Sequence, residues 1–336
     1  DAMTTINTIL GGAKLGGKNH HGSLTMIPLR SEGGSSTEYL TLAEALEAGL
    51  ARVGEVSEGG SVPELRFTNS AAMPVLIVDG EELVGAKQNR VANLTILAPA
   101  KSTIRIPVSC VEAGRWRYSR EDFVASKRVH FAKGRAARAR SVSESMEHDR
   151  GRYSDQGQVW REISAKARRM SVASPTDAMA AIFDDHAKGV EEYVDAFAAG
   201  GEDSGAVFAI GDEVVGLDFF SEPATFRAML PKLVRSYAVD ALEQAGEQVC
   251  EKAKKKARGF LDRLRAADER EYPAVGLGTD IRLTGPGVVG GALVVGGDCV
   301  HLAAFATPQN GGGRGRERTR STMASARLRR RRYEVD

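Results

Sequence analysis

The sequence is poor in cysteine. It contains three cysteines among 336 residues, and Cys110, Cys250 and Cys299 lie far apart with no CxxC pair among them. This spacing argues against a disulfide framework and against a cysteine-based structural zinc site, and it fits a reducing compartment. The fold must therefore be stabilised by its packed core, and the hydrophobic content of 42% is enough to exclude wholesale disorder.

The sequence also lacks long apolar runs. No run approaches the roughly 20 residues that a transmembrane helix needs. Residues 4–10 (TTINTIL) are too short and too polar for the apolar region of a signal peptide. We therefore expect a cytoplasmic protein with no membrane partner.

The chain as a whole has no large excess of charge, because 46 Lys and Arg residues face 44 Asp and Glu residues. This balance hides a cancellation. Residues 313–336 carry nine Arg and three acidic residues, a net charge of +6, which leaves 37 basic and 41 acidic residues, a net charge of −4, in the other 312 residues. An acidic body with a basic tail does not exclude an anionic partner.

Short β-rich runs fill residues 62–111, where Asn-Ser, Asp-Gly and Pro-Ala turns separate VPELRFTN, MPVLIVDG, VANLTILAP and STIRIPVSCV. This pattern predicts an antiparallel meander with one face on a core. A second pair of strands is predicted at residues 206–210 and 214–220. Two glycine-rich strands are predicted at residues 278–284 and 290–304.

Helices are predicted around these strands. Thr41 and Glu44 have the T-x-x-E spacing of a capping box and begin an amphipathic helix over residues 41–53. A basic stretch, residues 115–140, leads into a Ser- and Arg-rich segment, residues 141–155, that is typical of an exposed loop. Further helices are predicted at residues 156–171, 176–198 and 223–266.

These elements predict an α+β fold, with an antiparallel sheet or sandwich-like core and helices packed around it. We expect one domain over residues 21–308, preceded by a flexible glycine-rich N-terminus over residues 1–20. An Arg-rich tail is expected over residues 309–336. The long helix and the glycine-rich strands could bury against another copy, so a homo-oligomer is a candidate assembly.

Several short motifs match the residue pattern of known binding sites but lack the neighbouring residue or helix that those sites require. Gly12 to Lys18 nearly satisfies GxxxxGK[ST], but Asn19 replaces the hydroxyl residue and no helix is predicted to follow. Gly285 to Gly290 matches GxGxxG, also without a following helix, so we predict a β-turn. The six histidines show no HExxH or HxH spacing that would indicate a metal site.

The run Gly80 to Arg90 (GEELVGAKQNR) is longer and more polar than an ordinary hairpin loop of about two to five residues. Its side chains can make directional hydrogen bonds to a polar ligand: Glu81, Glu82, Lys87, Gln88, Asn89 and Arg90. Arg90 can fork onto a phosphate or a carboxylate, and the two glutamates can act as acid and base or hold a divalent cation. The alternative is an internal network that ties the loop to the sheet.

A second polar run, Cys110 to Trp116 (CVEAGRW), ends the next pair of predicted strands. Glu112, Arg115 and Trp116 can join the first run across the meander, with Trp116 stacking on a base and Arg115 facing a phosphate. The alternative is a capped strand end with Trp116 in the core. Cys110 itself is more typical of an inert core thiol than of a nucleophile.

GEELVGAKQNR, followed by NLTILAPAKSTIRIPVSCVEAGRW, resembles the ARG-and-rhodanese-phosphatase-superfamily-associated domain. The resemblance also takes in YLTLAEAL (residues 39–46), Gln156 to Trp160 and VVGLDFF, and so covers most of residues 20–305. This family is named for its neighbours, ADP-ribosylglycohydrolases and rhodanese-like phosphatases. The resemblance implies a link to the metabolism of ADP-ribose, NAD-derived nucleotides or ADP-ribosylated substrates.

Three functions remain open on the sequence. In the first, the two runs bind a nucleotide-like small molecule, and any catalysis is hydrolysis of ADP-ribose-type or other phosphorylated substrates. The candidate catalytic residues are Glu81, Glu82 and Glu112, and the candidate ligand-binding residues are Lys87, Gln88, Asn89, Arg90, Arg115 and Trp116. In the second, residues 115–140 and the Arg-rich tail bind nucleic acid. In the third, the protein is a structural or assembly protein whose polar runs only hold the fold.

Overall fold

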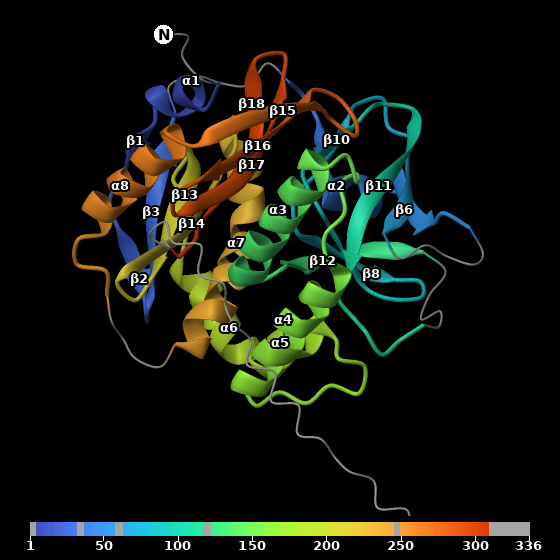
Figure 1. Cartoon of the computed structure of the whole chain (residues 1–336), viewed down its shortest axis with the longest axis horizontal. Coiled ribbons are helices and arrows are strands. Elements are labelled where there is room, and N and C mark those ends of the chain that lie inside the picture. The colour runs from blue at the N-terminus through green and yellow to red at the C-terminus, as the bar shows by residue number, and fades with distance from the viewer. Residues whose placement is uncertain (1–4, 32–36, 58–62, 117–121, 245–248, 309–336) are drawn as a thin grey trace, which may run out of the picture.

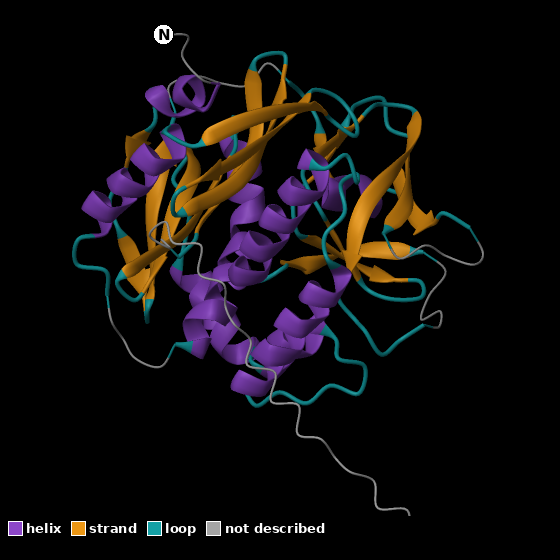
Figure 2. Cartoon of the chain, in the orientation of Figure 1, coloured by secondary structure: helices purple, strands orange, loops and turns teal. Residues whose placement is uncertain are grey.

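The computed structural model describes residues 5–31, 37–57, 63–116, 122–244 and 249–308. Their fold is α+β, as predicted, and combines a large antiparallel sheet, a small closed barrel and a third, smaller sheet. Figures 1 and 2 show the large sheet and the barrel side by side, with helices packed between them. No helix in these residues is both long and apolar enough to cross a membrane.

Nine strands form the large sheet, in the order β1-β3-β13-β14-β18-β17-β16-β15 with β2 also paired to β3. They are β1 (Lys14–Leu15), β2 (Asn19–His21), β3 (Leu24–Arg30), β13 (Asp203–Ile210), β14 (Glu213–Phe219), β15 (Asp268–Pro273), β16 (Thr279–Gly285), β17 (Val288–Val295) and β18 (Asp298–Ala306). The predicted strand pair over residues 206–220 is confirmed as β13 and β14. The predicted strand over residues 290–304 is two strands, β17 and β18, because the chain turns at Gly296 and Gly297, whose φ angles of 59° and 94° suit glycine.

Six strands close the barrel in the order β11-β6-β5-β12-β8-β9. They are β5 (Ala51–Glu55), β6 (Glu64–Asn69), β8 (Glu81–Gly85), β9 (Arg90–Ala92), β11 (Ser102–Cys110) and β12 (Phe123–Val129). The predicted meander is antiparallel but not sequential, because β7 (Val75–Ile77) and β10 (Ile96–Ala98) form the third sheet with β4 (Leu40–Thr41). The barrel closes by pairing β5 with β12, which are far apart in the sequence, and local patterns do not encode such a pairing.

Eight helices lie in the described residues: α1 (Thr5–Gly11), α2 (Leu42–Glu47), α3 (Ala132–Glu147), α4 (Gln156–Arg169), α5 (Met179–Asp185), α6 (Ala187–Ala196), α7 (Pro223–Glu243) and α8 (Ala253–Arg265). The capping box is confirmed: the Thr41 hydroxyl accepts from the Glu44 N–H, and the Glu44 carboxylate accepts from the Thr41 N–H. The helix that it begins is shorter than predicted, because β5 follows from Ala51. The predicted helices over residues 176–198 and 223–266 are each two helices.

Two predictions of irregular chain were wrong. Residues 141–147, expected in an exposed loop, continue α3, because Val142 and Met146 are buried in the barrel core. The N-terminus, expected to be flexible, forms α1, β1 and β2, and Ile6 and Leu10 of α1 are fully buried in the core beneath α8. Burial of a few apolar side chains stabilises both segments more than their polar or glycine-rich composition suggests. The predicted tail over residues 309–336 lies outside the described residues.

Helices cover both faces of the large sheet, as the alternating side chains of β3 show. Met26 lies in the core that includes α7 residues, whereas Ile27 and Leu29 lie in the core that includes α1 and α8 residues. This period of two is that of a strand buried on both faces. Helix α7 also contacts β12, so it connects the sheet to the barrel.

A buried ionic network joins the barrel side of the molecule to the large sheet. Arg135 of α3 donates to the two carboxylate oxygens of Asp218 on β14 at 2.6 and 3.1 Å, and to Asp79 beside β8 at 3.2 Å. Arg138, one turn further along α3, donates to Asp79 at 2.7 Å. Burial disfavours the charge on Arg135, but the attraction of Asp218 and Asp79 outweighs it and raises the pKa of Arg135. Burial likewise opposes ionisation of Asp218, yet Arg135 holds its pKa well below the ordinary range.

The network continues into the large sheet through hydroxyl and imidazole groups. The Tyr237 hydroxyl donates to Asp218 at 2.9 Å, and His301 lies 3.3 Å from the same carboxylate. The Thr95 hydroxyl accepts from the Asp79 N–H at 3.1 Å and lies 2.7 Å from His301 Nδ1. Barrel side, helix α3 and sheet therefore share one set of hydrogen bonds.

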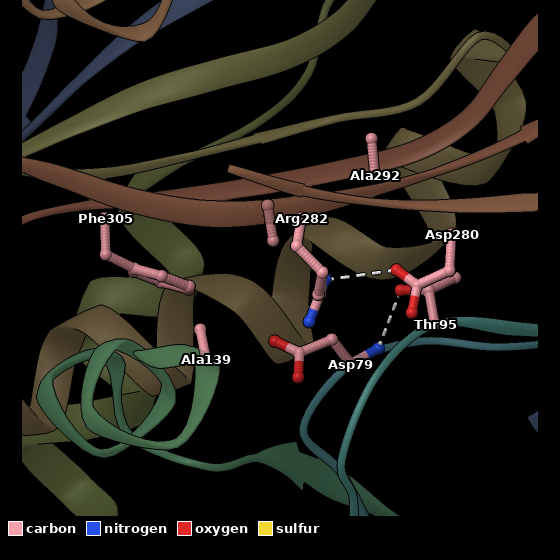
Figure 3. A pocket seen from close by; sticks show the side chains of 9 residues that line it. Asp79, Thr95, Ala139, Asp280, Arg282, Ala292 and Phe305 are labelled. Atoms are coloured by element: carbon pink, nitrogen blue, oxygen red, sulfur yellow. Dashed lines mark hydrogen bonds and ion pairs between the residues drawn. The ribbon is translucent and has the colours of Figure 1, made fainter. Parts of the chain in front are cut away.

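A cavity of about 10 Å³ lies beside Asp79 (Figure 3). Asp280 and Arg282 of β16 line it and pair with each other at 3.1 Å. Burial raises the pKa of Asp280. The volume accommodates about one water molecule, so solutes larger than water do not reach the network by this route.

A second buried ion cluster fixes α4 against α7. The Lys166 ammonium is fully buried and donates to Asp240 at 2.6 Å and to Glu243 at 2.7 Å. Burial opposes ionisation of Glu243, but its hydrogen bonds from Arg169 and Lys166 lower its pKa to about 2. The two helices are therefore joined by charge as well as by apolar packing.

The Arg135→Ala variant should be less stable than the wild type by about 3–5 kcal/mol, because it leaves Asp218 buried without its counter-charge. The control, Arg105→Ala, breaks an exposed pair with Glu64 and should cost less than about 1 kcal/mol. Urea unfolding followed by circular dichroism measures both free energies. Equal losses in the two variants would contradict a central role for the network.

Acid should destabilise the protein through the buried carboxylates. Glu243, Asp218 and Asp79 all have lowered pKa values in the folded state, so the unfolded state binds more protons below their ordinary pKa values. The free energy of unfolding should therefore be undiminished above about pH 5 and fall as the pH drops toward 2. Urea unfolding between pH 6 and pH 3 should show this fall, and Glu243→Gln should make the slope shallower by about one proton. An unchanged slope in that variant would argue against the ion cluster.

Candidate functional site

The two polar runs meet at one end of the barrel. In the loop between β8 and β9, Gln88 Nε2 donates to the Glu112 carbonyl at 2.9 Å, and the Asn89 N–H donates to the Glu112 carboxylate at 3.2 Å. Arg90 and Cys110 are directly opposed on neighbouring strands β9 and β11. The prediction that the runs join across the strands is therefore confirmed.

Arg115 ties the two runs together. Its guanidinium donates to the Glu112 carboxylate at 2.9 Å, to the Ala86 carbonyl at 2.8 Å and to Asn89 Oδ1 at 3.0 Å. Ala86 has a φ of 38°, a backbone angle that residues other than glycine rarely adopt. The bonds from Arg115 therefore hold a strained turn. Burial opposes the charge on Glu112, but hydrogen bonds from Arg115 and the Asn89 N–H hold its pKa below the ordinary range. This part of the site matches the internal-network alternative.

Arg90 is only partly satisfied by such contacts. Its side chain is 0% exposed, and Nη1 donates to Gln88 Oε1 at 3.0 Å. Nε and Nη2 have no hydrogen-bond partner within the described part of the chain. These two nitrogens form one edge of the guanidinium, the edge that binds two oxygens of a phosphate or a carboxylate at once. Buried charged donors without partners cost several kcal/mol, so this edge indicates a place for a ligand.

Glu55, which the sequence interpretation missed, faces the same interior. It is opposed to Leu65 of β6, and Arg90 is opposed to Leu83 of β8, and both leucines lie in the barrel core. Both Glu55 carboxylate oxygens are buried and lack a partner among the described residues. Burial lowers the pKa of Arg90, and the nearby negative charges, Glu55 included, oppose this shift. The barrel interior thus contains a buried carboxylate, Glu55, and a buried guanidinium, Arg90, each with atoms that make no hydrogen bond to the described residues.

A signal for Glu55 existed in the sequence. Val53 and Glu55 have the period-two spacing of one strand face, so a buried Val53 places Glu55 toward the same interior. The glycine-rich residues that follow Glu55 instead favour a turn in which Glu55 is exposed to solvent. Local sequence patterns do not decide between a buried and an exposed Glu55 side chain.

Trp116 lies at the outer side of this site. Its ring is 49% exposed, so the alternative of a core tryptophan is wrong. Arg90 Cζ lies 5.8 Å and Lys87 Nζ lies 5.4 Å from the ring centroid, within the range of cation–π contacts. A half-exposed indole beside two cations offers a stacking surface next to anion-binding groups.

Among the described residues, no hydrogen bond or ion pair joins Glu81 or Glu82 to Arg90, and each glutamate pairs with another cation. As consecutive residues of β8 they point to opposite faces, and Glu81 accepts from Lys232 at 2.7 Å while Glu82 accepts from Arg128 at 2.6 Å. Their role as acid and base stays a prediction. Cys110 donates to Gln88 Oε1 at 3.1 Å, and burial raises the pKa of its thiol, as suits an inert core cysteine.

The other motifs do not build a site. Gly12 to Lys18 follows α1 instead of preceding a helix, and Gly285 to Gly290 spans the predicted turn, between β16 and β17. In the described parts of residues 115–140, the basic side chains do not form a continuous surface, because Arg115, Arg135 and Arg138 are buried in ion pairs. In the ranges that the structure covers, no group of three or more His, Cys, Asp or Glu side chains could hold a metal ion.

Comparison with known proteins gives one match. A family model described as the ARG and Rhodanese-Phosphatase-superfamily-associated Protein domain matches residues 12–305. This range contains both polar runs, the barrel and nearly all of the large sheet. No curated protein and no solved structure matches the chain.

The same substitution at two arginines of the site should change the free energy of unfolding by different amounts. Arg115→Met should lower the free energy of unfolding by about 2–4 kcal/mol. It removes the counter-charge of the buried Glu112 and the hydrogen bonds that Arg115 donates to Ala86 and Asn89. Arg90→Met should change it by less than about 1 kcal/mol or raise it, because it removes a buried charge whose edge is unpaired. Urea unfolding without added ligand measures both. A large loss in Arg90→Met would show that Arg90 is a structural residue.

Proposed function

We propose a function for this chain as a member of the ARG and rhodanese-phosphatase-superfamily-associated protein domain family, to which it belongs. The protein binds ADP-ribose or an NAD-derived nucleotide at the Arg90 end of the barrel. The observation that carries this proposal is the unpaired edge of the buried Arg90 guanidinium beneath the half-exposed Trp116 ring. The family name supports the ligand class, because its first part refers to ADP-ribosylglycohydrolases.

A phosphate suits the Arg90 edge. Nε–H and Nη2–H are parallel donors, and a phosphate oxygen pair accepts from both at once. The positive charge of Arg90 has no direct ion-pair partner among the described side chains, so a bound anion would neutralise it. Lys87 lies on the same ring of Trp116 and adds a second cation near the anion.

The remaining parts of a nucleotide find matching groups. The exposed part of Trp116 supplies a flat face on which a base can stack. The unpaired Glu55 carboxylate accepts hydrogen bonds, which ribose hydroxyls donate. Arg90 Cζ lies 5.8 Å from the centroid of the Trp116 ring, so a ligand bound at Arg90 should alter Trp116 fluorescence.

Any hydrolysis at this site would draw its general base from Glu55. Glu112 is held by Arg115, Asn89 and Thr176, and Glu81 and Glu82 are held by Lys232 and Arg128. Glu55 alone among these carboxylates has both oxygens unpartnered within the described residues. In this role it would accept a proton from the attacking water.

ADP-ribose should raise the melting temperature of the protein, and isothermal titration calorimetry should detect its binding. At a ligand concentration of one hundred times Kd, binding should raise the free energy of unfolding by about 2.7 kcal/mol. Arg90→Gln and Trp116→Ala should each weaken binding at least about tenfold, since each removes a direct contact. Arg66→Gln, which removes an exposed arginine from the outer face of the same barrel, should leave binding within about twofold.

The ligand panel should include NAD, AMP and inorganic phosphate. Chromatography of ADP-ribose and NAD after incubation detects turnover, and Glu55→Gln should abolish any turnover while keeping binding. Absence of binding to every nucleotide by a folded protein would refute the proposal. Equal weakening in Arg66→Gln and Arg90→Gln would refute the placement of the site.

A further inference from the structure

A wide basic groove is lined by residues of α3, α4 and α8. Its volume is about 1020 Å³, and its floor is made by the start of β14 and the end of β18. Val214 and Ala306 of these strands and Ala136 of α3 are among its small or apolar lining residues. The groove is therefore open enough for a polymer chain and shares no residue with the Arg90 site.

Cations outnumber anions along the groove. Six basic side chains line it: Lys133, Arg140, Lys252, Lys255, Lys256 and Arg263. Three acidic side chains also line it, Glu162, Asp212 and Glu213, which leaves a net charge of +3. This excess stands against a net charge of −4 for the chain outside residues 313–336, so the groove is a local basic feature of an acidic body.

Several of these basic side chains make no ion pair or hydrogen bond with the described residues. Lys256 pairs with Asp212 at 2.6 Å. In contrast, Lys252, Lys255 and Arg140 make no ion pair or hydrogen bond to any described residue, and all three are exposed. Lys252, Lys255 and Arg263 mark one side of α8, about 16 Å from end to end at 1.5 Å per residue. Such a row can follow several successive phosphates of a single strand.

The last described residues of the chain, Thr307 and Pro308, lie at this groove. The 28 residues that follow begin with QNGGGRGRERTR and contain nine arginines. Arginine interspersed with glycine is a composition of segments that bind single-stranded nucleic acids. The basic composition of this sequence and the basic lining of the groove both favour a polyanionic partner.

We infer that this groove binds the phosphate backbone of a single-stranded nucleic acid. The acidic body disfavours contact along a duplex, which requires a wide basic surface. The apolar floor between the cations gives unstacked bases a surface to lie against. This site is separate from the nucleotide site proposed above and does not depend on it.

The test measures fluorescence anisotropy of labelled 20-nucleotide RNA and DNA single strands with the full chain at several salt concentrations. Lys252→Glu with Lys255→Glu should weaken binding at least about tenfold and reduce the salt slope by about two. The matched control is Lys254→Glu with Arg258→Glu, which makes the same charge change on the same helix, at exposed residues outside the groove. Arg140→Glu tests the opposite wall on α3, and it should weaken binding in the same direction.

The controls separate the groove from other sources of binding. Equal loss in the groove pair and in the matched pair would overturn the inference, because binding would then follow net charge alone. Unchanged binding in the groove pair would also overturn it and assign the affinity to the tail. Binding to anionic lipid vesicles but not to oligonucleotides would overturn the partner class. ADP-ribose binding should be unchanged in all these variants, so failure here and failure of the nucleotide proposal are distinguishable.

Discussion

The guanidinium of Arg135, held between Asp218 and Asp79, is the interaction on which the architecture depends. Its partners come from β14 of the large sheet and from the residues just before β8 of the barrel, while Arg135 itself belongs to α3. A buried charge cannot be left half paired without a large loss of free energy. The relative position of sheet, helix and barrel is therefore fixed by one set of directional bonds, within an apolar core that alone would tolerate some sliding.

Three buried arginines show how pairing distinguishes structure from function. Each guanidinium nitrogen of Arg135 donates to a carboxylate, and the three nitrogens of Arg115 donate to a carboxylate, a carbonyl and an amide oxygen. Arg90 is equally buried but uses one nitrogen, toward Gln88. Folding stability explains the first two and does not explain the third, because a fold selected for stability alone gains by replacing an unpaired buried charge. That asymmetry is why the proposed ligand site centres on Arg90 and not on the residues with the most contacts.

The two proposed binding surfaces use charge in different ways. At the barrel, a few desolvated groups lie in the interior, where each hydrogen bond discriminates strongly between ligands. In the groove, exposed lysines and arginines face solvent, where the interaction is screened by salt and follows the number of phosphates. The first arrangement suits recognition of one small molecule, and the second suits a polymer without sequence preference.

Local rules in the sequence determined several elements. The capping box at Thr41, the strand pair over residues 206–220 and the meeting of the two polar runs all follow from spacings within a few residues or between adjacent strands. Such features need no knowledge of the rest of the chain. The α+β class follows from the same local alternation of strands and helices.

Only the tertiary structure decided which polar groups are satisfied. Barrel closure pairs β5 with β12 and turns Glu55 and Arg90 to one interior. Val142 and Met146 extend α3 because a core that is built from distant strands receives them. Composition fixes how many charges a chain carries, but the free energy of each charge depends on the neighbours and the water that the folded chain leaves around it.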